Sequence, residues 1–308
     1  LINFTLNGKD VTAQEGETIW QVAERQGVEI PHLCYTTATG YRADGNCRTC
    51  MVEVEGERVL AASCIRQPAD GMVVNTASER AKKARETVFE MLLADQPGRD
   101  KAHDPDSRFW NWIDKIDLKT SRFPEREKVK ADTSHIAMSV QLDACIHCNL
   151  CVRACREVQI NDVIGMAKRG IKSEIVFDFG DPMGNSTCVA CGECVQACPT
   201  GALMPSSVLD KRGVRTEFAE KTVDSLCPYC GVGCQTTVHV KDDKILHVEG
   251  REGPANENRL CVKGRFGFDY VNHPERLTKP LIRKGDAKKD AHIRLDPSNP
   301  LTHFREAT

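Results

Sequence analysis

"CIHCNLCVRAC" (residues 145–155) and "CVACGECVQAC" (residues 188–198) are two copies of one pattern, C-x2-C-x2-C-x3-C. In each copy three cysteines fall within seven residues, so that a short segment can wrap closely around one cluster, as is typical of [4Fe-4S] binding. The repeat indicates a pseudo-symmetric two-cluster module, in which the fourth cysteine of each run ligates the other cluster. We therefore predict one [4Fe-4S] cluster on Cys145, Cys148, Cys151 and Cys198, and a second on Cys188, Cys191, Cys194 and Cys155.

Two other uses of cysteine fit this pattern less well. Disulfides are not favoured, because the N-terminal sequence lacks the basic-then-apolar order of an export signal. Zinc sites usually present two well-separated cysteine pairs rather than three thiols in a row. The two copies differ in that Pro199 ends the second while Arg156 follows the first. The segment "EIVFDFGDPMG" (174–184) is expected to lengthen a loop or hairpin without disturbing the ligand spacing.

The N-terminal cysteines lie in a different setting. Apolar residues alternate from residue 2 to residue 6, a turn follows at Asn7-Gly8, and an amphipathic segment runs from 18 to 26 and stops at Gly27. Strand, turn, helix and then cysteines is the order of a β-grasp ferredoxin. The loop "GYRADGNCRTC" (40–50) is glycine-containing, as a backbone must be where it approaches a cluster sulfide. A [2Fe-2S] cluster is predicted on Cys34, Cys47, Cys50 and Cys64.

This region departs from plant-type spacing and resembles the N-terminal domain shared by the large iron–sulfur subunit of complex I, iron-only hydrogenases and bacterial NAD-linked formate dehydrogenases. Those relatives commonly hold a further cluster on one His and three Cys in the next, helical, segment. Residues 77–118 offer only His103 and no cysteine. We expect a helix over 77–94 with a capping box of Thr76 and Glu79, and an ordinary loop role for His103. The space of that cluster should be packed by Phe109, Trp110, Ile113 and Ile116.

The last group is "CPYCGVGC" (227–234), completed only by Cys261. A hairpin over 236–250, turning at Asp242-Asp243, would carry the chain away and back. The arrangement resembles the small N-terminal [4Fe-4S] domain of molybdopterin oxidoreductases, which implies a cluster on Cys227, Cys230, Cys234 and Cys261. The string "CVKGRFGFDY" (261–270) resembles the alpha subunit of bacterial formate dehydrogenases. That resemblance implies that Lys263 binds near the pterin and is the electron bridge between pterin and cluster.

The expected fold class is α+β with several domains: 1–78 β-grasp [2Fe-2S], 79–135 helical connector without cluster ligands, 136–208 two-cluster ferredoxin, 220–275 molybdopterin-oxidoreductase [4Fe-4S], and 276–308 a tail. Over nearly all of the 308 residues this order resembles the formate dehydrogenase alpha subunit.

The resemblance implies a molybdenum or tungsten bis-molybdopterin guanine dinucleotide in the rest of the subunit, and a diaphorase-type partner with FMN and NAD. Electrons from formate would pass Lys263 and the three [4Fe-4S] clusters and leave through the [2Fe-2S] cluster; reversal would reduce CO2. Without the pterin domain, these residues are not expected to oxidise formate by themselves.

Two alternatives stay open: the equivalent segment of a hydrogenase or NADH-quinone reductase, and a zinc-bearing structural protein. The net charge of −2 and the absence of a basic stripe do not indicate a nucleic-acid partner. No apolar run approaches the roughly 18 residues of a membrane span, and a cytoplasmic protein is expected.

Overall fold

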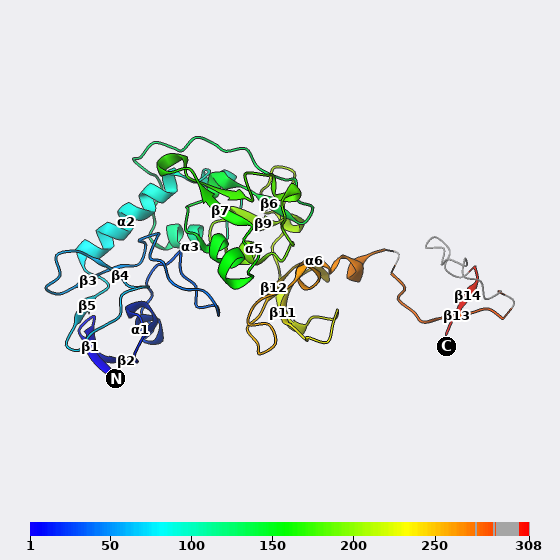
Figure 1. Ribbon diagram of the computed structural model, residues 1–308, viewed down its shortest axis with the longest axis horizontal. Helices are drawn as coiled ribbons and strands as arrows, with labels where there is room; N and C mark the ends of the chain where they lie inside the picture. The colour runs from blue at the N-terminus through cyan, green and yellow to red at the C-terminus, as the bar shows by residue number, and fades with distance from the viewer. Residues whose placement is uncertain (275, 286, 288–301, 308) are drawn as a thin grey trace.

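The computed structural model describes residues 1–274, 276–285, 287 and 302–307. Figure 1 shows the N-terminal domain at the lower left, the middle domain above and to the right of it, and the sheet of residues 221–250 below the middle domain. In the described part of the chain, no helix is both long and apolar enough to cross a membrane. The predicted tail lies partly outside the described residues, and its described part contains a pair of short strands, β13 (Leu281–Arg283) and β14 (Phe304–Glu306).

The N-terminal domain is a mixed five-stranded sheet with one helix, α1 (Ile19–Arg25). Its strands are β1 (Ile2–Leu6), β2 (Lys9–Ala13), β3 (Met51–Val54), β4 (Ala61–Ala62) and β5 (Val73–Asn75), in the order β2-β1-β5-β3-β4. Asn7 and Gly8 both have positive φ, as a two-residue hairpin between β1 and β2 requires. Thr18 and Gln21 form a capping box on α1, and Gly27 follows its end with φ +73°. The predicted hairpin and helix are both confirmed.

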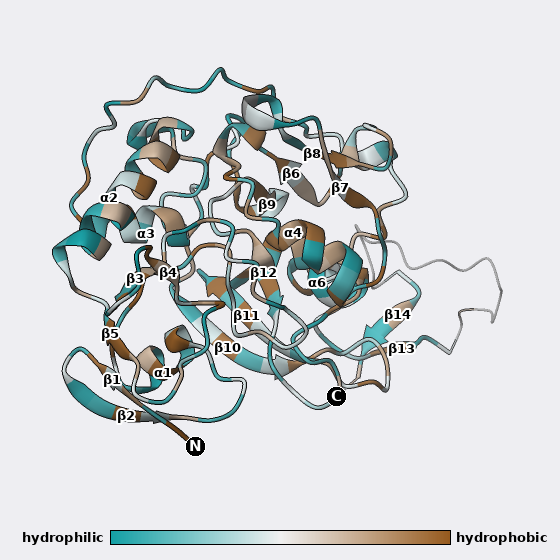
Figure 2. Ribbon diagram, turned by 60° about the vertical axis from the view of Figure 1, so that its left-hand side comes forward, coloured by the Kyte–Doolittle hydropathy of each residue, from teal (hydrophilic) through white to brown (hydrophobic). Residues whose placement is uncertain are grey.

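The connector begins with α2 (Glu79–Ala94) and α3 (Arg108–Lys115). The predicted cap was wrong, because Ser78 caps α2 by accepting from the amide of Ala81. The Thr76 hydroxyl instead accepts from Asn7 Nδ2 at 2.8 Å, and the Thr76 amide donates to Asn7 Oδ1 at 2.8 Å. The "ERAKKARE" half of α2 is largely hydrophilic and mostly exposed (Figure 2).

The predicted aromatic packing of the connector is confirmed. Phe109, Trp110 and Ile113 are buried, and Ile116 is partly buried against the same core. After α3 the chain runs from about 118 to 137 without a helix and passes along the outer side of the middle domain (Figure 1). The connector is therefore helical only in its first part, because residues 118–137 are polar and lack a repeating apolar stripe.

The middle domain holds the two cysteine runs on short helices between small strand pairs. Its elements are β6 (Met138–Val140), α4 (Leu150–Arg153), a π-helical turn (Ala154–Val158), β7 (Ile164–Ala167), β8 (Glu174–Phe177), α5 (Glu193–Ala197) and β9 (Leu203–Pro205). β6 pairs with β9, and β7 with β8, both antiparallel. The insertion therefore begins as the second strand of a hairpin, as predicted.

The third domain is a three-stranded antiparallel sheet of β10 (Lys221–Leu226), β11 (Gln235–Lys241) and β12 (Lys244–Gly250), followed by α6 (Val262–Phe266). Asp242 and Asp243 both have positive φ, so the predicted turn is confirmed. β13 (Leu281–Arg283) and β14 (Phe304–Glu306) form a separate strand pair.

Candidate metal centres

The structure brings the fourth cysteine of each central run to the other run. The thiols of Cys145, Cys148 and Cys151 all have Cys198 as a close neighbour, and those of Cys188, Cys191 and Cys194 have Cys155. Burial raises the pKa of the Cys151 and Cys194 thiols well above the usual value, and the surrounding thiols raise it further. Buried thiolates this close would repel one another unless they shared cationic iron, so both donor sets fit a [4Fe-4S] cluster.

The two runs also repeat in their backbone conformation. His147 and Asn149 have positive φ in the first run, and Ala190 and Gly192 have positive φ at the matching places in the second. These turns direct amides toward sulfur: His147 N lies 3.5 Å from Cys145 Sγ, and Ala190 N lies 3.4 Å from Cys188 Sγ. Amide donors of this kind stabilise thiolate charge around a cluster.

The two halves differ where the sequence differs. α5 ends at Ala197, just before Cys198 and Pro199, whereas α4 runs on through Cys155 as a π-helical turn. Proline supplies no amide to continue a helix, but Arg156 does. The turn places Cys155 Sγ within 3.3 Å of the amide of Val163.

The N-terminal cysteines meet where two domains pack together. Cys47 N donates to Cys34 Sγ at 3.4 Å, and Cys50 Sγ lies 3.4 Å from Cys64 Sγ. Cys34 also has Cys47 and Cys64 as side-chain neighbours. Cys50 and Cys64 belong to the core of the N-terminal domain, whereas Cys34 belongs to the core of the middle domain and Cys47 packs against it. This site is therefore formed against the middle domain.

The third domain gathers its four cysteines at one end of the sheet. Burial raises the pKa of the Cys234 thiol, and its neighbours Cys227, Cys230 and Cys261 raise it further. Cys230 and Cys261 are exposed, unlike the cysteines of the first run in the middle domain. Lys263 lies on α6 with an exposed side chain, and its carbonyl accepts from Gly267 N at 2.9 Å. The chain thus brings together all four predicted sets, while the ligand roles and the bridging role of Lys263 remain predictions.

Gly250 controls the return of the chain to Cys261. A Cβ at this position would lie 1.9 Å from the carbonyl oxygen of Asn258, a backbone atom that cannot rotate away. We expect Gly250→Ala to displace the loop before Cys261 and to remove about four iron atoms per chain. Iron analysis measures this, with Gly165→Ala as the control, since a Cβ there meets nothing within 4 Å. A native iron content in Gly250→Ala would contradict the expectation.

A buried ion pair that the sequence did not indicate connects three domains at the second cysteine run. Arg265 Nη2 lies 3.1 Å from Glu193 Oε2, and the two side chains are only 3% and 2% exposed. Tyr41 OH donates to Glu193 Oε1 at 2.9 Å, and Arg265 Nε donates to the carbonyl of Cys191 at 3.1 Å. In the sequence, the only sign of this ion pair was an acidic residue, Glu193, between Cys191 and Cys194.

His103 is not an ordinary loop histidine. It is largely buried, with Nδ1 2.9 Å from the carbonyl oxygen of Gly213 and Nε2 2.8 Å from Asp143 Oδ1. Burial lowers its pKa, but the hydrogen bond and charge of Asp143 and the Gly213 carbonyl together outweigh burial and raise it. His103 therefore joins the connector to the start of the first cysteine run.

Among the described residues, a further group of side chains of metal-ligand type lies on the β11–β12 hairpin. The ligand atoms of His239, His247 and Glu249 lie within 4.8 Å of one another. The two imidazole rings are stacked, with an interplanar angle of 15°, so their in-plane nitrogen lone pairs do not converge on one point. Burial lowers the pKa of His247 to about 4, and the charges of His239, Arg215 and Arg265 lower it further. Positive charge is therefore disfavoured at this place.

Comparisons with known families identify the class of these domains. A model described as "2Fe-2S iron-sulfur cluster binding domain" matches residues 1–79, "4Fe-4S dicluster domain" matches 144–202, and "Molybdopterin oxidoreductase Fe4S4 domain" matches 220–273. The chain is therefore an iron–sulfur electron-transfer module of the kind found in oxidoreductases. The predicted domain limits are close to these ranges but remain predictions.

Its relatives belong to several kinds of oxidoreductase. It is 33% identical to an NADH-quinone oxidoreductase subunit of Rhizobium meliloti, over 92% of this chain and 33% of that protein. It is 28% identical to a putative formate dehydrogenase of Bacillus subtilis, over 93% of this chain and 33% of that protein. An NAD+-reducing [NiFe]-hydrogenase in the H2-reduced state matches with a TM-score of 0.61 at 28% identity, covering 67% of this chain and 87% of that one.

The chain spans about a third of the length of the curated relatives that it matches.

Proposed function

We propose that this chain is the iron–sulfur relay of a formate dehydrogenase alpha subunit, connecting a molybdenum- or tungsten-pterin centre to a flavin- and NAD-bearing partner. The main support for an electron relay is that the fold gathers the 16 cysteines into four sets of four neighbouring thiols. When bound, the clusters would each accept and release an electron.

The residues of the chain have distinct roles in this proposal. The first set, Cys34, Cys47, Cys50 and Cys64, would hold [2Fe-2S] and lie nearest the flavin partner. The two crosswise sets would hold [4Fe-4S] clusters in the buried middle domain. The set of Cys227, Cys230, Cys234 and Cys261 would face the pterin domain, with Lys263 as the bridge between them. Its two exposed cysteines support this orientation, because a further domain can cover them.

Formate as the substrate class is supported by the string "CVKGRFGFDY" and by the similarity to a putative formate dehydrogenase. A second candidate is the equivalent relay of an NADH-quinone reductase or NAD-reducing hydrogenase. It is favoured by the 33% identity to a protein of the NADH-quinone oxidoreductase kind and by the similarity to the hydrogenase structure.

The complete protein with its flavin-bearing partner tests the choice. We expect formate-dependent reduction of NAD by the anaerobically purified complex. Reduction of NAD by H2, or oxidation of NADH by a quinone, without any formate activity would replace the first candidate by the second.

A further inference from the structure

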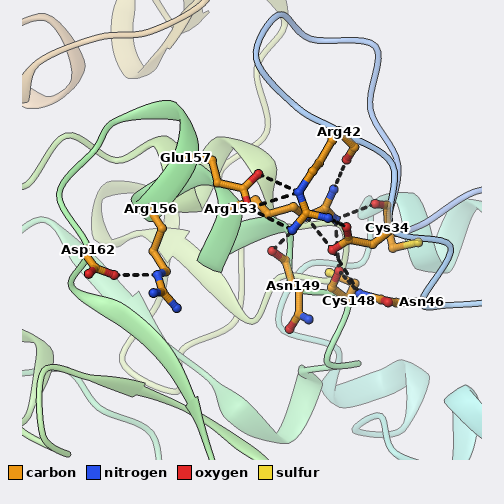
Figure 3. A network of polar contacts seen from close by, with 10 residues as sticks. Cys34, Arg42, Asn46, Cys148, Asn149, Arg153, Arg156, Glu157 and Asp162 are labelled. Atoms are coloured by element: carbon orange, nitrogen blue, oxygen red, sulfur yellow. Dashed lines mark hydrogen bonds and ion pairs between the residues drawn. The ribbon is translucent and has the colours of Figure 1, made fainter. Parts of the chain in front are cut away.

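Arg153 fills the junction between the first cysteine set and the first run of the middle domain. It is the last residue of α4, its side chain is 2% exposed, and its guanidinium points into the loop of the N-terminal domain (Figure 3). The connector contains no cysteine that could hold a further cluster between the Cys34 set and the Cys145 set. Any direct contact between these two sets must therefore come from other residues.

One nitrogen of Arg153 touches both sets. Nη2 donates to the carbonyl oxygen of Cys34 at 2.8 Å and to that of Cys148 at 3.3 Å (Figure 3). Cys34 belongs to the N-terminal set and Cys148 to the Cys145 set, so one guanidinium nitrogen joins the peptide groups of two predicted ligands. Asn46 Nδ2 also reaches the carbonyl oxygen of Cys148, at 3.5 Å.

The remaining contacts hold the guanidinium in this position. Nη1 donates to the carbonyl of Arg42, and Nε lies 3.4 Å from the carbonyl oxygen of Asn149 and 3.2 Å from Asp44 Oδ2. A planar, always charged guanidinium with five donors suits such multiple carbonyl contacts, and an ammonium cannot reproduce them.

The charge of Arg153 lies against the peptide groups of Cys34 and Cys148, one from each set. Asp44 offsets part of it, while Arg42 and Glu157, at the rim, are 63% and 38% exposed and screened by water. Arg108 adds a second cation at this junction, donating to the carbonyl of Tyr35 at 3.0 Å. A buried cation favours the more negative, reduced form of any group held nearby, and so raises its reduction potential.

We propose that Arg153 is the positioning residue that couples the Cys34 set to the Cys145 set, by joining their ligand loops and by raising the potentials of both centres. The proposal rests on the proposed relay. The step that it assists is the transfer of one electron from one centre to the other, with no bond formed and no proton moved.

The test compares three variants of the complete protein in potentiometric titrations followed by electron paramagnetic resonance. Arg153→Met removes the bridge and the charge, Arg153→Lys keeps the charge, and Arg42→Met removes an exposed charge from the same network. We expect Arg153→Met to shift the [2Fe-2S] potential and one [4Fe-4S] potential to lower values, with the other two centres unchanged. Arg42→Met should leave all four at native values.

Arg153→Lys separates the bridge from the charge. We expect near-native potentials but slower electron equilibration between the two centres, measured after rapid reduction. Native potentials in an iron-replete Arg153→Met protein would overturn the electrostatic role. Native equilibration in Arg153→Lys would overturn the bridge, and this variant decides the proposal if Arg153→Met loses its iron. A native protein without iron would instead refute the relay itself.

Discussion

Replacing Cys148 by alanine is expected to remove about four of roughly 14 iron atoms per chain and to destabilise both halves of the middle domain. Cys148 is buried, with Cys198, Cys145 and Cys34 as its neighbours, so its loss leaves three thiols where a cubane needs four. Cys198 belongs to the second cysteine run, so loss of this cluster also removes a connection between the two halves of the middle domain. Cluster binding is expected to supply much of the stability of so small a domain.

Iron, sulfide and thermal unfolding measure the effect of Cys148→Ala. Ile146→Val is the matched control, because Ile146 is a buried neighbour that offers no ligand atom. The control should keep its iron and lose only about 0.5–1.5 kcal/mol of stability. Unchanged iron content and melting in Cys148→Ala would show that Cys148 is not a ligand.

Arg265→Met is expected to destabilise the docking of the third domain by roughly 3–5 kcal/mol, because it leaves the Glu193 carboxylate buried without its partner. Both side chains are nearly inaccessible to water, so solvent cannot replace the lost ion pair. The variant also loses the contact with the carbonyl of Cys191.

The midpoint of denaturant-induced loss of the iron–sulfur absorbance reports this effect. The double variant Arg265→Met with Glu193→Gln is the control: it leaves no buried charge and should recover part of the stability, with the amide still accepting from Tyr41. A single variant as stable as the native protein would mean that the ion pair contributes nothing to docking.

The features that sequence predicted correctly depend on local chemistry. Asn7-Gly8 and Asp242-Asp243 carry the positive φ values of their hairpins, and Gly27 follows the end of α1, because those conformations are set by the residues themselves. The crosswise gathering of the middle cysteines was also predictable, since spacing and repetition define it.

The features that sequence missed depend on distant partners. Arg153 and Arg265 reach carbonyls in other domains, and neither has a local pattern that marks it as buried. His103 was misjudged because its two partners, Asp143 and Gly213, are far away in the chain. The cap of α2 was misplaced because a residue in the first turn of the protein, Asn7, binds Thr76.

The iron, acid-labile sulfide and zinc contents of the anaerobically purified protein show directly whether its 16 cysteines hold iron–sulfur clusters. We expect about 14 iron atoms per chain with matching sulfide, from one two-iron and three four-iron clusters. About four zinc atoms and no sulfide would contradict it, and would make the cysteines structural.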